Sequence, residues 1–421
     1  MQRHRCERDQ NDCLLPRTVV VSHRTDNRLR VALVHVMSTT TDRTLSPVRG
    51  AVYVPARAFN AYQFWEAYDP DETERDFRLA AKLNRDALRL FLSYEYWFDA
   101  PEAMERRVDN LFSTAEKEGI RVLPILFESA GEDPTRERCQ DQDPHTACAV
   151  RSPSHDIIND ESRWSGRGDG GASGSDGDGI FSEAKQALGL GGGSQHTEEG
   201  RDADDRFGRR PGGPREYVEW FVDRYGDDDA LLALEIMNEP GDWGQRLKFA
   251  RRMLRVADEH RNDLPLTMGC KGLRYNTLYD GPELDVFQFH LNLPPTARKM
   301  QERMQKAREF ADEHDKPVWL TEWQRTREEP PDKFLPNYAS LAETIRDGPV
   351  DGDFFWSLML KPAYLPDQRE KGRINGVFHR NGSVYSVSDA QALAGDGSLD
   401  IDERQQQPSW LPADLTRAET E

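Results

Sequence analysis

From about residue 49 to residue 360, the chain alternates between two kinds of segment that differ in their pattern of hydrophobic residues. Short and nearly continuous apolar runs, such as ALRLFLSY (87–94) and RVLPILFE (121–128), predict strands that are buried on both faces. Polar segments with apolar residues at helical spacing, such as DETERDFRLAAKLNR (71–85), lie between these runs. Apolar strands separated by amphipathic helices are typical of a parallel sheet that is covered by helices.

The whole pattern predicts eight such strands, with helices or room for helices between them. The strands are centred near residues 52, 90, 124, 234, 267, 288, 319 and 355, and the clearest helices are expected at 71–85, 101–119, 215–225, 245–261, 296–314 and 334–346. Eight strand–helix units favour a (β/α)8 barrel, a TIM barrel of the α/β class, over an open doubly wound sheet. No GxGxxG motif follows an early strand, which further disfavours a dinucleotide-binding fold.

Three polar segments interrupt or flank this single predicted domain, which we place at 47–395. Residues 1–46 are arginine-rich and lack a sustained period, and we interpret them as a poorly ordered extension in which Met37 is a plausible alternative start. Residues 165–213 are dominated by Gly, Asp, Ser and Arg, and they bury too little apolar area to offset the entropy lost on ordering. We therefore predict a flexible insertion after the third strand, and a polar tail at 396–421.

Composition adds an acidic surface to this picture. The formal net charge is −19, with only 11 lysines against 45 arginines. Hydrated carboxylates keep a chain soluble in concentrated salt, so we favour a halophilic protein over an acidic protein from a GC-rich genome. Excess negative charge argues against nucleic acid as a partner. We find no signal peptide and no apolar run of about 18 residues, so we expect a cytoplasmic protein without a membrane partner.

The five cysteines do not point to a metal or disulfide framework. Their number is odd and no CxxC pair occurs. Cys139 and Cys148 could bridge within a loop, although buried or free thiols are favoured. We expect neither a metal nor a cofactor, and the pattern does not indicate an oligomeric state.

Candidate chemistry gathers where the predicted strands end. Asn238 and Glu239 close the fourth strand, and Glu322 lies near the end of the seventh. A barrel brings the carboxyl ends of its strands to one face, and two carboxylates about 5–5.5 Å apart are what retaining glycoside hydrolysis requires. A single Glu at a strand end is more often a solvated residue or a helix cap, so the argument rests on the pair.

Other residues at the strand ends fit the same site. Arg89 lies inside an apolar strand and requires a carboxylate partner there. His290 ends the sixth strand, and three tryptophans lie near strand ends: Trp97, Trp323 and Trp356. Aromatic rings suit the apolar faces of sugars. The alternative is that the histidine is a hydrogen-bonded structural residue and that the tryptophans belong to the core.

Together these residues resemble glycoside hydrolase family 5 and its wider clan over roughly residues 48–392, the insertion excepted. The motifs are NEP at the fourth strand, TEW at the seventh, Arg in the second, His in the sixth and Trp in the eighth. The resemblance implies that Glu239 is the acid/base and Glu322 the nucleophile, and that Asn238 binds the substrate 2-hydroxyl. It also implies that Arg89 and His290 orient the glutamates and that Trp356 stacks beneath the sugar.

Two departures from the family pattern leave the substrate open. The sixth strand has His290-Leu291-Asn292 where many members have His-x-Tyr, and the third ends in Glu128 where a histidine is common. We expect a retaining hydrolase of cellulose-, mannan- or xylan-type β-glycans, with an exo-β-glycosidase or transglycosylase as the nearest alternative. A barrel that binds glycan without cleaving it is the alternative from another class. We also expect burial and Glu322 to raise the pKa of Glu239.

Overall fold

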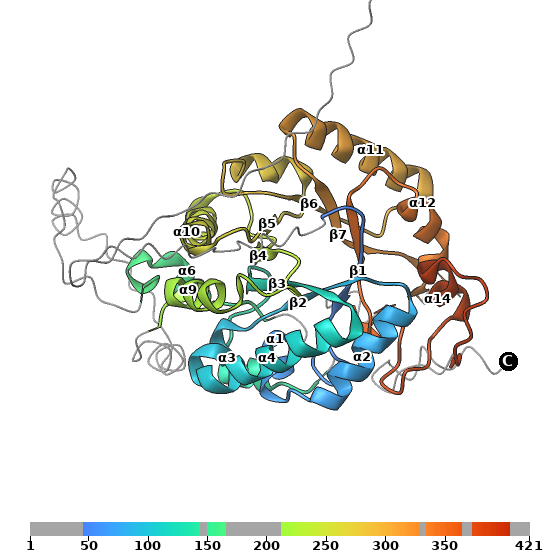
Figure 1. Ribbon diagram of the computed structural model, residues 1–421, viewed down its shortest axis with the longest axis horizontal. Helices are drawn as coiled ribbons and strands as arrows, with labels where there is room; N and C mark the ends of the chain where they lie inside the picture. The colour runs from blue at the N-terminus through green and yellow to red at the C-terminus, as the bar shows by residue number, and fades with distance from the viewer. Residues whose placement is uncertain (1–44, 144–149, 166–211, 329–333, 364–372, 405–421) are drawn as a thin grey trace, which may run out of the picture. The chain divides into compact units, whose positions relative to one another are not determined.

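Eight parallel strands form a closed barrel in this protein, whose computed structural model describes residues 45–143, 150–165, 212–328, 334–363 and 373–404 (Figure 1). The strands are β1 (Val48–Tyr53), β2 (Ala87–Phe91), β3 (Arg121–Glu128), β4 (Leu234–Asn238), β5 (Leu266–Gly269), β6 (Phe287–Asn292), β7 (Val318–Gln324) and β10 (Gly352–Phe355). Hydrogen-bonded pairs give the order β5-β4-β3-β2-β1-β10-β7-β6. A parallel bridge between Thr267 and Val286 joins the two ends, so the predicted (β/α)8 barrel is confirmed.

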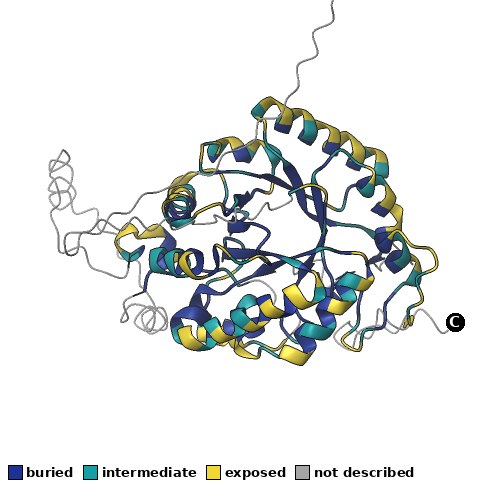
Figure 2. Cartoon of the chain, in the orientation of Figure 1, coloured by how far each residue is buried: buried dark blue, intermediate teal, exposed yellow. Residues whose placement is uncertain are grey.

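Amphipathic helices surround this barrel, as Figure 1 shows. They are α2 (Pro70–Lys82), α4 (Pro101–Glu118), α9 (Pro214–Tyr225), α10 (Gly244–His260), α11 (Ala297–His314) and α12 (Ala342–Arg346). Local signals set their ends: the Asp69 side chain caps the first turn of α2, and Gly119 ends α4 at φ +67°. Figure 2 shows the result, with buried strands inside and helices whose exposed faces point outward.

Shorter elements lie in the connections between these strands and helices and after the last barrel strand. The helices are α1 (Ala61–Glu66), α3 (Tyr94–Asp99), α5 (Arg136–Gln140), α6 (His155–Asn159) and α14 (Val387–Ala394), and the 3-10 turns are η1 (Glu161–Arg163), η2 (Leu273–Leu278) and η3 (Tyr338–Ser340). Two small antiparallel pairs join β8 (Thr326–Glu328) to β9 (Phe334–Pro336), and β11 (Lys361–Pro362) to β12 (Ile374–Asn375). No helix in the described ranges is both long and apolar enough to cross a membrane.

One predicted helix is wrong in its first half. We expected a helix over 334–346, but only Ala342–Arg346 forms α12. The beginning of this segment pairs with β8 instead, and Asn337 donates its backbone N–H to the Arg325 carbonyl at 2.9 Å. The reason is Pro336, because a proline disfavours helical backbone at the residue before it.

Most of the predicted N-terminal extension, insertion and tail lies outside the described residues. The first part of the predicted tail is described and pairs with the rest of the chain. Val384 donates its N–H to the Asp402 carbonyl at 2.8 Å, and Arg404 donates to the Val384 carbonyl at 2.8 Å. Backbone pairing therefore continues beyond residue 395.

Candidate active site

The two predicted glutamates meet at the carboxyl ends of β4 and β7. One carboxylate oxygen of Glu239, one of Glu322 and a ring nitrogen of His290 all lie within 4.8 Å of one another. This separation suits a retaining glycosidase, in which the second carboxylate reaches the anomeric carbon directly. The same three groups are close enough to coordinate one metal ion, which the sequence pattern does not indicate.

Glu322 is held by two donors at the floor of the site. Arg89 Nη1 donates to Oε1 at 2.9 Å, and Asn292 Nδ2 donates to Oε2 at 3.3 Å. Asn292 stands where many members of family 5 have the tyrosine of the His-x-Tyr motif. An amide therefore reaches the carboxylate from this position of β6.

Arg89 is anchored mainly by Glu235, which we did not identify from the sequence. Its Nε and Nη2 donate to the two oxygens of Glu235 at 2.7 and 2.6 Å, and both side chains are fully buried. Burial lowers the pKa of Arg89, but Glu235 and then Glu322 raise it above its usual value. Gly269 leaves room for this pair, since a Cβ there would collide with the Glu235 carboxylate.

Asn238 is held from both sides of its amide. Its Oδ1 accepts from Arg89 Nη2 at 2.7 Å, and its Nδ2 donates to Glu128 Oε2 at 2.9 Å. These two partners fix which amide atom is oxygen and which is nitrogen, because the guanidinium only donates and the Glu128 carboxylate accepts.

The backbone at Glu239 turns sharply out of β4. Its φ is +42°, a left-handed conformation that costs a residue other than glycine about 1–2 kcal/mol. The Glu239 N–H donates to the Gly269 carbonyl at 2.8 Å, and Ser129 Oγ donates to the Glu239 carbonyl. Neighbouring strands thus impose a strained backbone at the residue that faces the cleft.

Two neighbouring side chains favour the ionised form of Glu239. His290 Nδ1 lies 2.8 Å from Oε1, and Lys271 Nζ lies 3.4 Å from Oε2. Burial raises the pKa of Glu239. His290 and then Lys271 lower it by more, so that the net result is a pKa of about 2, below its usual value. Our expectation of a raised pKa is therefore wrong, because His290, 51 residues away in sequence, faces this carboxylate more closely than it faces Glu322.

The tautomer of His290 follows from its surroundings. Its Nε2 is buried and has no hydrogen-bond partner among the described residues. A proton there would be left unsatisfied, whereas a proton on Nδ1 is donated to the ionised Glu239. We therefore assign the proton of His290 to Nδ1.

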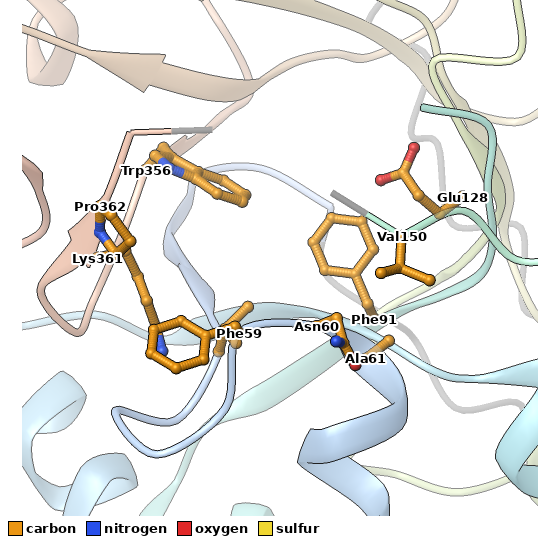
Figure 3. Close-up of a pocket in the computed structure, with 10 residues that line it drawn as sticks. Phe59, Asn60, Ala61, Phe91, Glu128, Val150, Trp356, Lys361 and Pro362 are labelled. Atoms are coloured by element: carbon orange, nitrogen blue, oxygen red, sulfur yellow. The ribbon is translucent and has the colours of Figure 1, made fainter. Parts of the chain in front are cut away.

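A cavity of about 460 Å³ opens above these groups. Its walls include Phe91, Glu128, Asn238, Glu239, Lys271, Asn292, Leu293, Glu322, Gln324, Trp356 and Asn375. A second cavity adjoins it and shares Phe91, Glu128 and Trp356 (Figure 3). Trp356, a predicted stacking residue, thus lines both cavities.

The other two predicted tryptophans lie in the core and line neither cavity. Trp97, in α3, packs at 5.1 Å from the Tyr217 ring. Trp323 is buried and donates its indole N–H to Asp353 at 3.0 Å. It follows Glu322 directly in β7, and successive side chains of a strand point to opposite faces. The core interpretation therefore holds for both, and our prediction of substrate contacts at Trp97 and Trp323 is corrected.

Solved structures that are similar to this chain include glycoside hydrolases. An exo-β-1,4-mannosidase from Opitutaceae bacterium strain TAV5 has a TM-score of 0.53 and 16% identity, over 83% of this chain and 58% of that chain. An endo-β-1,4-mannanase from Thermotoga petrophila has a TM-score of 0.50 and 14% identity, over 86% and 79% of the two chains. A family 5 mannosidase from Rhizomucor miehei has a TM-score of 0.50 and 14% identity, over 83% and 92%.

These similarities define the class of the fold. The chain has a (β/α)8 barrel like that of glycoside hydrolase family 5. No protein-family model and no curated protein sequence matches it. At 14–16% identity the likeness concerns the fold, and the activity has to be argued from the site itself.

Proposed function

We propose that the protein is a retaining glycoside hydrolase that cleaves β-linked glycans through a glycosyl-enzyme intermediate. The observation that carries this proposal is the convergence of Glu239 and Glu322 within 4.8 Å on one face of the barrel. Two carboxylates at that separation leave no room for a water between nucleophile and sugar, so attack by the carboxylate itself is favoured.

Glu322 is the nucleophile in this proposal. Arg89 and Asn292 each hold one of its oxygens, which directs a lone pair at a sugar lying in the cavity above. Attack at the anomeric carbon forms an ester bond as the bond to the leaving oxygen breaks, and Glu239 gives that oxygen a proton. Glu239 then takes a proton from water, which displaces Glu322 and restores the original anomeric configuration.

Glu239 must acquire its proton before the first step. In the unbound protein His290 and Lys271 favour the carboxylate. The Lys271 side chain is 72% exposed, so a sugar entering the cleft can displace it and exclude water. Both changes favour the neutral acid, and we expect proton uptake by Glu239 to accompany substrate binding.

β-Linked mannosides are the first substrates to test. The similar structures named above are a mannanase and two mannosidases, of both endo and exo type. Trp356 and Phe91 offer ring faces on which the apolar side of a sugar can stack. Aryl β-mannosides, β-glucosides and β-xylosides, together with the corresponding polysaccharides, cover the β-glycans that this cleft chemistry fits.

The stereochemistry of the first product tests the proposal. We expect ¹H NMR of a hydrolysed aryl β-glycoside to show the β-anomer first, followed by mutarotation. The α-anomer appearing first would contradict a retaining mechanism. Binding of glycan with no product in a reducing-sugar assay at low and high salt would instead favour a glycan-binding barrel.

A further inference from the structure

Glu128 lies where the two cavities of the cleft meet. It is the last residue of β3 and lines both cavities, as do Phe91 and Trp356. Figure 3 shows its carboxylate beyond Phe91, on the side of the cavity opposite Trp356. Neither step of the proposed reaction uses this side chain.

Both oxygens of Glu128 are engaged on the protein side. Oε2 accepts from Asn238 Nδ2 at 2.9 Å, and Oε1 accepts from the backbone N–H of Ala130 at 2.7 Å. The β3 backbone is held in turn, because Glu128 and Ser152 exchange backbone hydrogen bonds at 2.7 and 2.9 Å. The carboxyl group of Glu128 is therefore held in a defined position.

Asn238 depends on this acceptor for its orientation. Arg89 holds the amide oxygen and Glu128 holds one hydrogen of the amide nitrogen. The other hydrogen on Nδ2 is not used by either contact. With both partners present the amide cannot rotate without breaking a charge-assisted hydrogen bond.

We propose that Glu128 is a positioning residue that fixes the Asn238 amide and thereby the place where the hydroxyl beside the reacting carbon binds. This inference rests on the proposed function, since it takes Asn238 as the residue that meets the substrate 2-hydroxyl. A hydroxyl held in one place contributes most in the transition state, where small misplacements are costly. Glu128 acts through Asn238 and touches no reacting atom.

The charge of Glu128 matters because of what faces it. Burial raises its pKa to about 8, and the nearby carboxylates of Glu239 and Glu322 contribute to the rise. Arg246 of α10 is near enough for the negative charge of Glu128 to raise the pKa of its guanidinium. Below this pKa the carboxyl group is neutral, and above it the cleft gains a third negative charge beside the reacting pair.

A comparison of 2-hydroxy and 2-deoxy substrates tests the role of Glu128. The experiment measures kcat/KM of the full-length protein and of Glu128→Ala, Glu128→Gln and Glu132→Gln on an aryl β-glycoside and on its 2-deoxy analogue. Glu132 is the matched control, since it lies just after β3 and its side chain is 71% exposed. Glutamine keeps the volume of Glu128, so Glu128→Gln guards against a folding defect in the alanine variant.

We expect Glu128→Ala to lose about 30–100-fold on the 2-hydroxy substrate and less than about 3-fold on the 2-deoxy analogue. Glu128→Gln should lose roughly 10-fold on the 2-hydroxy substrate, because one amide cannot accept from both Asn238 and Ala130. It should also abolish any fall in kcat/KM that has its midpoint near pH 8. Glu132→Gln should match the unmodified protein on both substrates.

Equal losses on the two substrates would show a general structural role and overturn the inference. No loss on either substrate would overturn it as well. Both results presuppose that the unmodified protein hydrolyses the 2-hydroxy glycoside. If it hydrolyses none of the β-glycosides, the proposed function fails first, and the two failures remain distinguishable.

Discussion

The two catalytic candidates are held in opposite ways. Glu322 rests on a sealed network in which Arg89 and Glu235 are fully buried and every charge faces a partner. Glu239 protrudes at φ +42° from the end of β4, and its partner Lys271 is 72% exposed. Glu322 is fixed by the interior of the barrel, whereas Glu239 is held by the buried His290 on one oxygen and by the exposed Lys271 on the other.

This difference matches what each step of the proposed reaction asks for. A nucleophile must stay ionised and aimed, and a buried guanidinium provides both. An acid/base must change its proton twice in each turnover, which requires surroundings that respond to the substrate. Replacement of the buried Arg89 should therefore affect folding as well as turnover, whereas replacements on the open side should affect mainly turnover and its pH dependence.

The largest effect is expected for Glu322→Ala. Loss of the nucleophile should lower kcat on an aryl β-glycoside by about 10⁴-fold or more, with little change in the far-UV circular dichroism spectrum. Added azide should restore turnover and give the α-glycosyl azide, because a small anion then attacks from the vacated side. Near-normal turnover without azide would remove Glu322 from its role.

Arg89→Ala should have the next largest effect, on folding. It leaves Glu235 buried without its cation, which costs about 3–5 kcal/mol in the free energy of unfolding. Urea denaturation measures this loss. Arg224→Ala is the matched control, since Arg224 pairs with Asp109 at the surface and exposed pairs contribute about 1 kcal/mol or less. Equal losses in the two variants would contradict a sealed network.

The barrel itself was predictable because its strands are buried on both faces. Continuous apolar runs at β2, β3 and β4 mark such strands directly, and all eight were found. The helix expected over 334–346 failed where a local proline competed with helical spacing. The sequence already argued against a substrate contact at Trp323. This residue follows Glu322 directly, so its side chain points to the opposite face of β7.

The ion pairs and pKa values of the site were harder to predict than the residues that form it. Glu235 interrupts the apolar run of β4 as Arg89 interrupts β2. Two isolated opposite charges in buried strands of one barrel were a usable signal for a pair. The lowered pKa of Glu239 depends on distances to His290 and Lys271 that only the fold brings about. No local pattern carries that information.

Buried and open carboxyl groups should give opposite pH dependences of stability. Glu95 is buried and accepts from Ser152 Oγ at 2.6 Å, and burial raises its pKa to about 7. Its contribution to stability is present below pH 4.5 and is lost as the pH rises through 7. Glu239 behaves in the opposite sense, since its pKa is lowered to about 2 and its contribution is lost as the pH falls from 4.5 through 2.

Glu95→Gln tests this contrast by urea unfolding between pH 4.5 and pH 8. In the unmodified protein, Glu95 should make the unfolding free energy decline by roughly 2–3 kcal/mol over this pH range. We expect Glu95→Gln to lack this decline. An unchanged slope would mean that Glu95 titrates normally in the folded protein.

The smallest of these effects concerns His290. Its replacement by alanine should raise the pKa of Glu239 by more than about one unit, equivalent to about 1.4 kcal/mol, because burial is then opposed by Lys271 alone. Carboxyl ¹³C NMR titration, assigned with a Glu239→Gln variant, measures the shift. Lys271→Gln should move the same pKa less, since the lysine is exposed. A larger shift for Lys271→Gln than for His290→Ala would reverse the assignment.

The central claim is that one face of the barrel presents a nucleophile and an acid/base within 4.8 Å of each other, and covalent trapping tests it more directly than any replacement. A 2-deoxy-2-fluoro analogue of a hydrolysed glycoside slows the breakdown of a glycosyl-enzyme, and peptide mass spectrometry then locates the sugar. The account predicts one sugar per chain on the peptide that contains Glu322. A label on a different residue, or continued hydrolysis of glycosides with no covalent label, would contradict it.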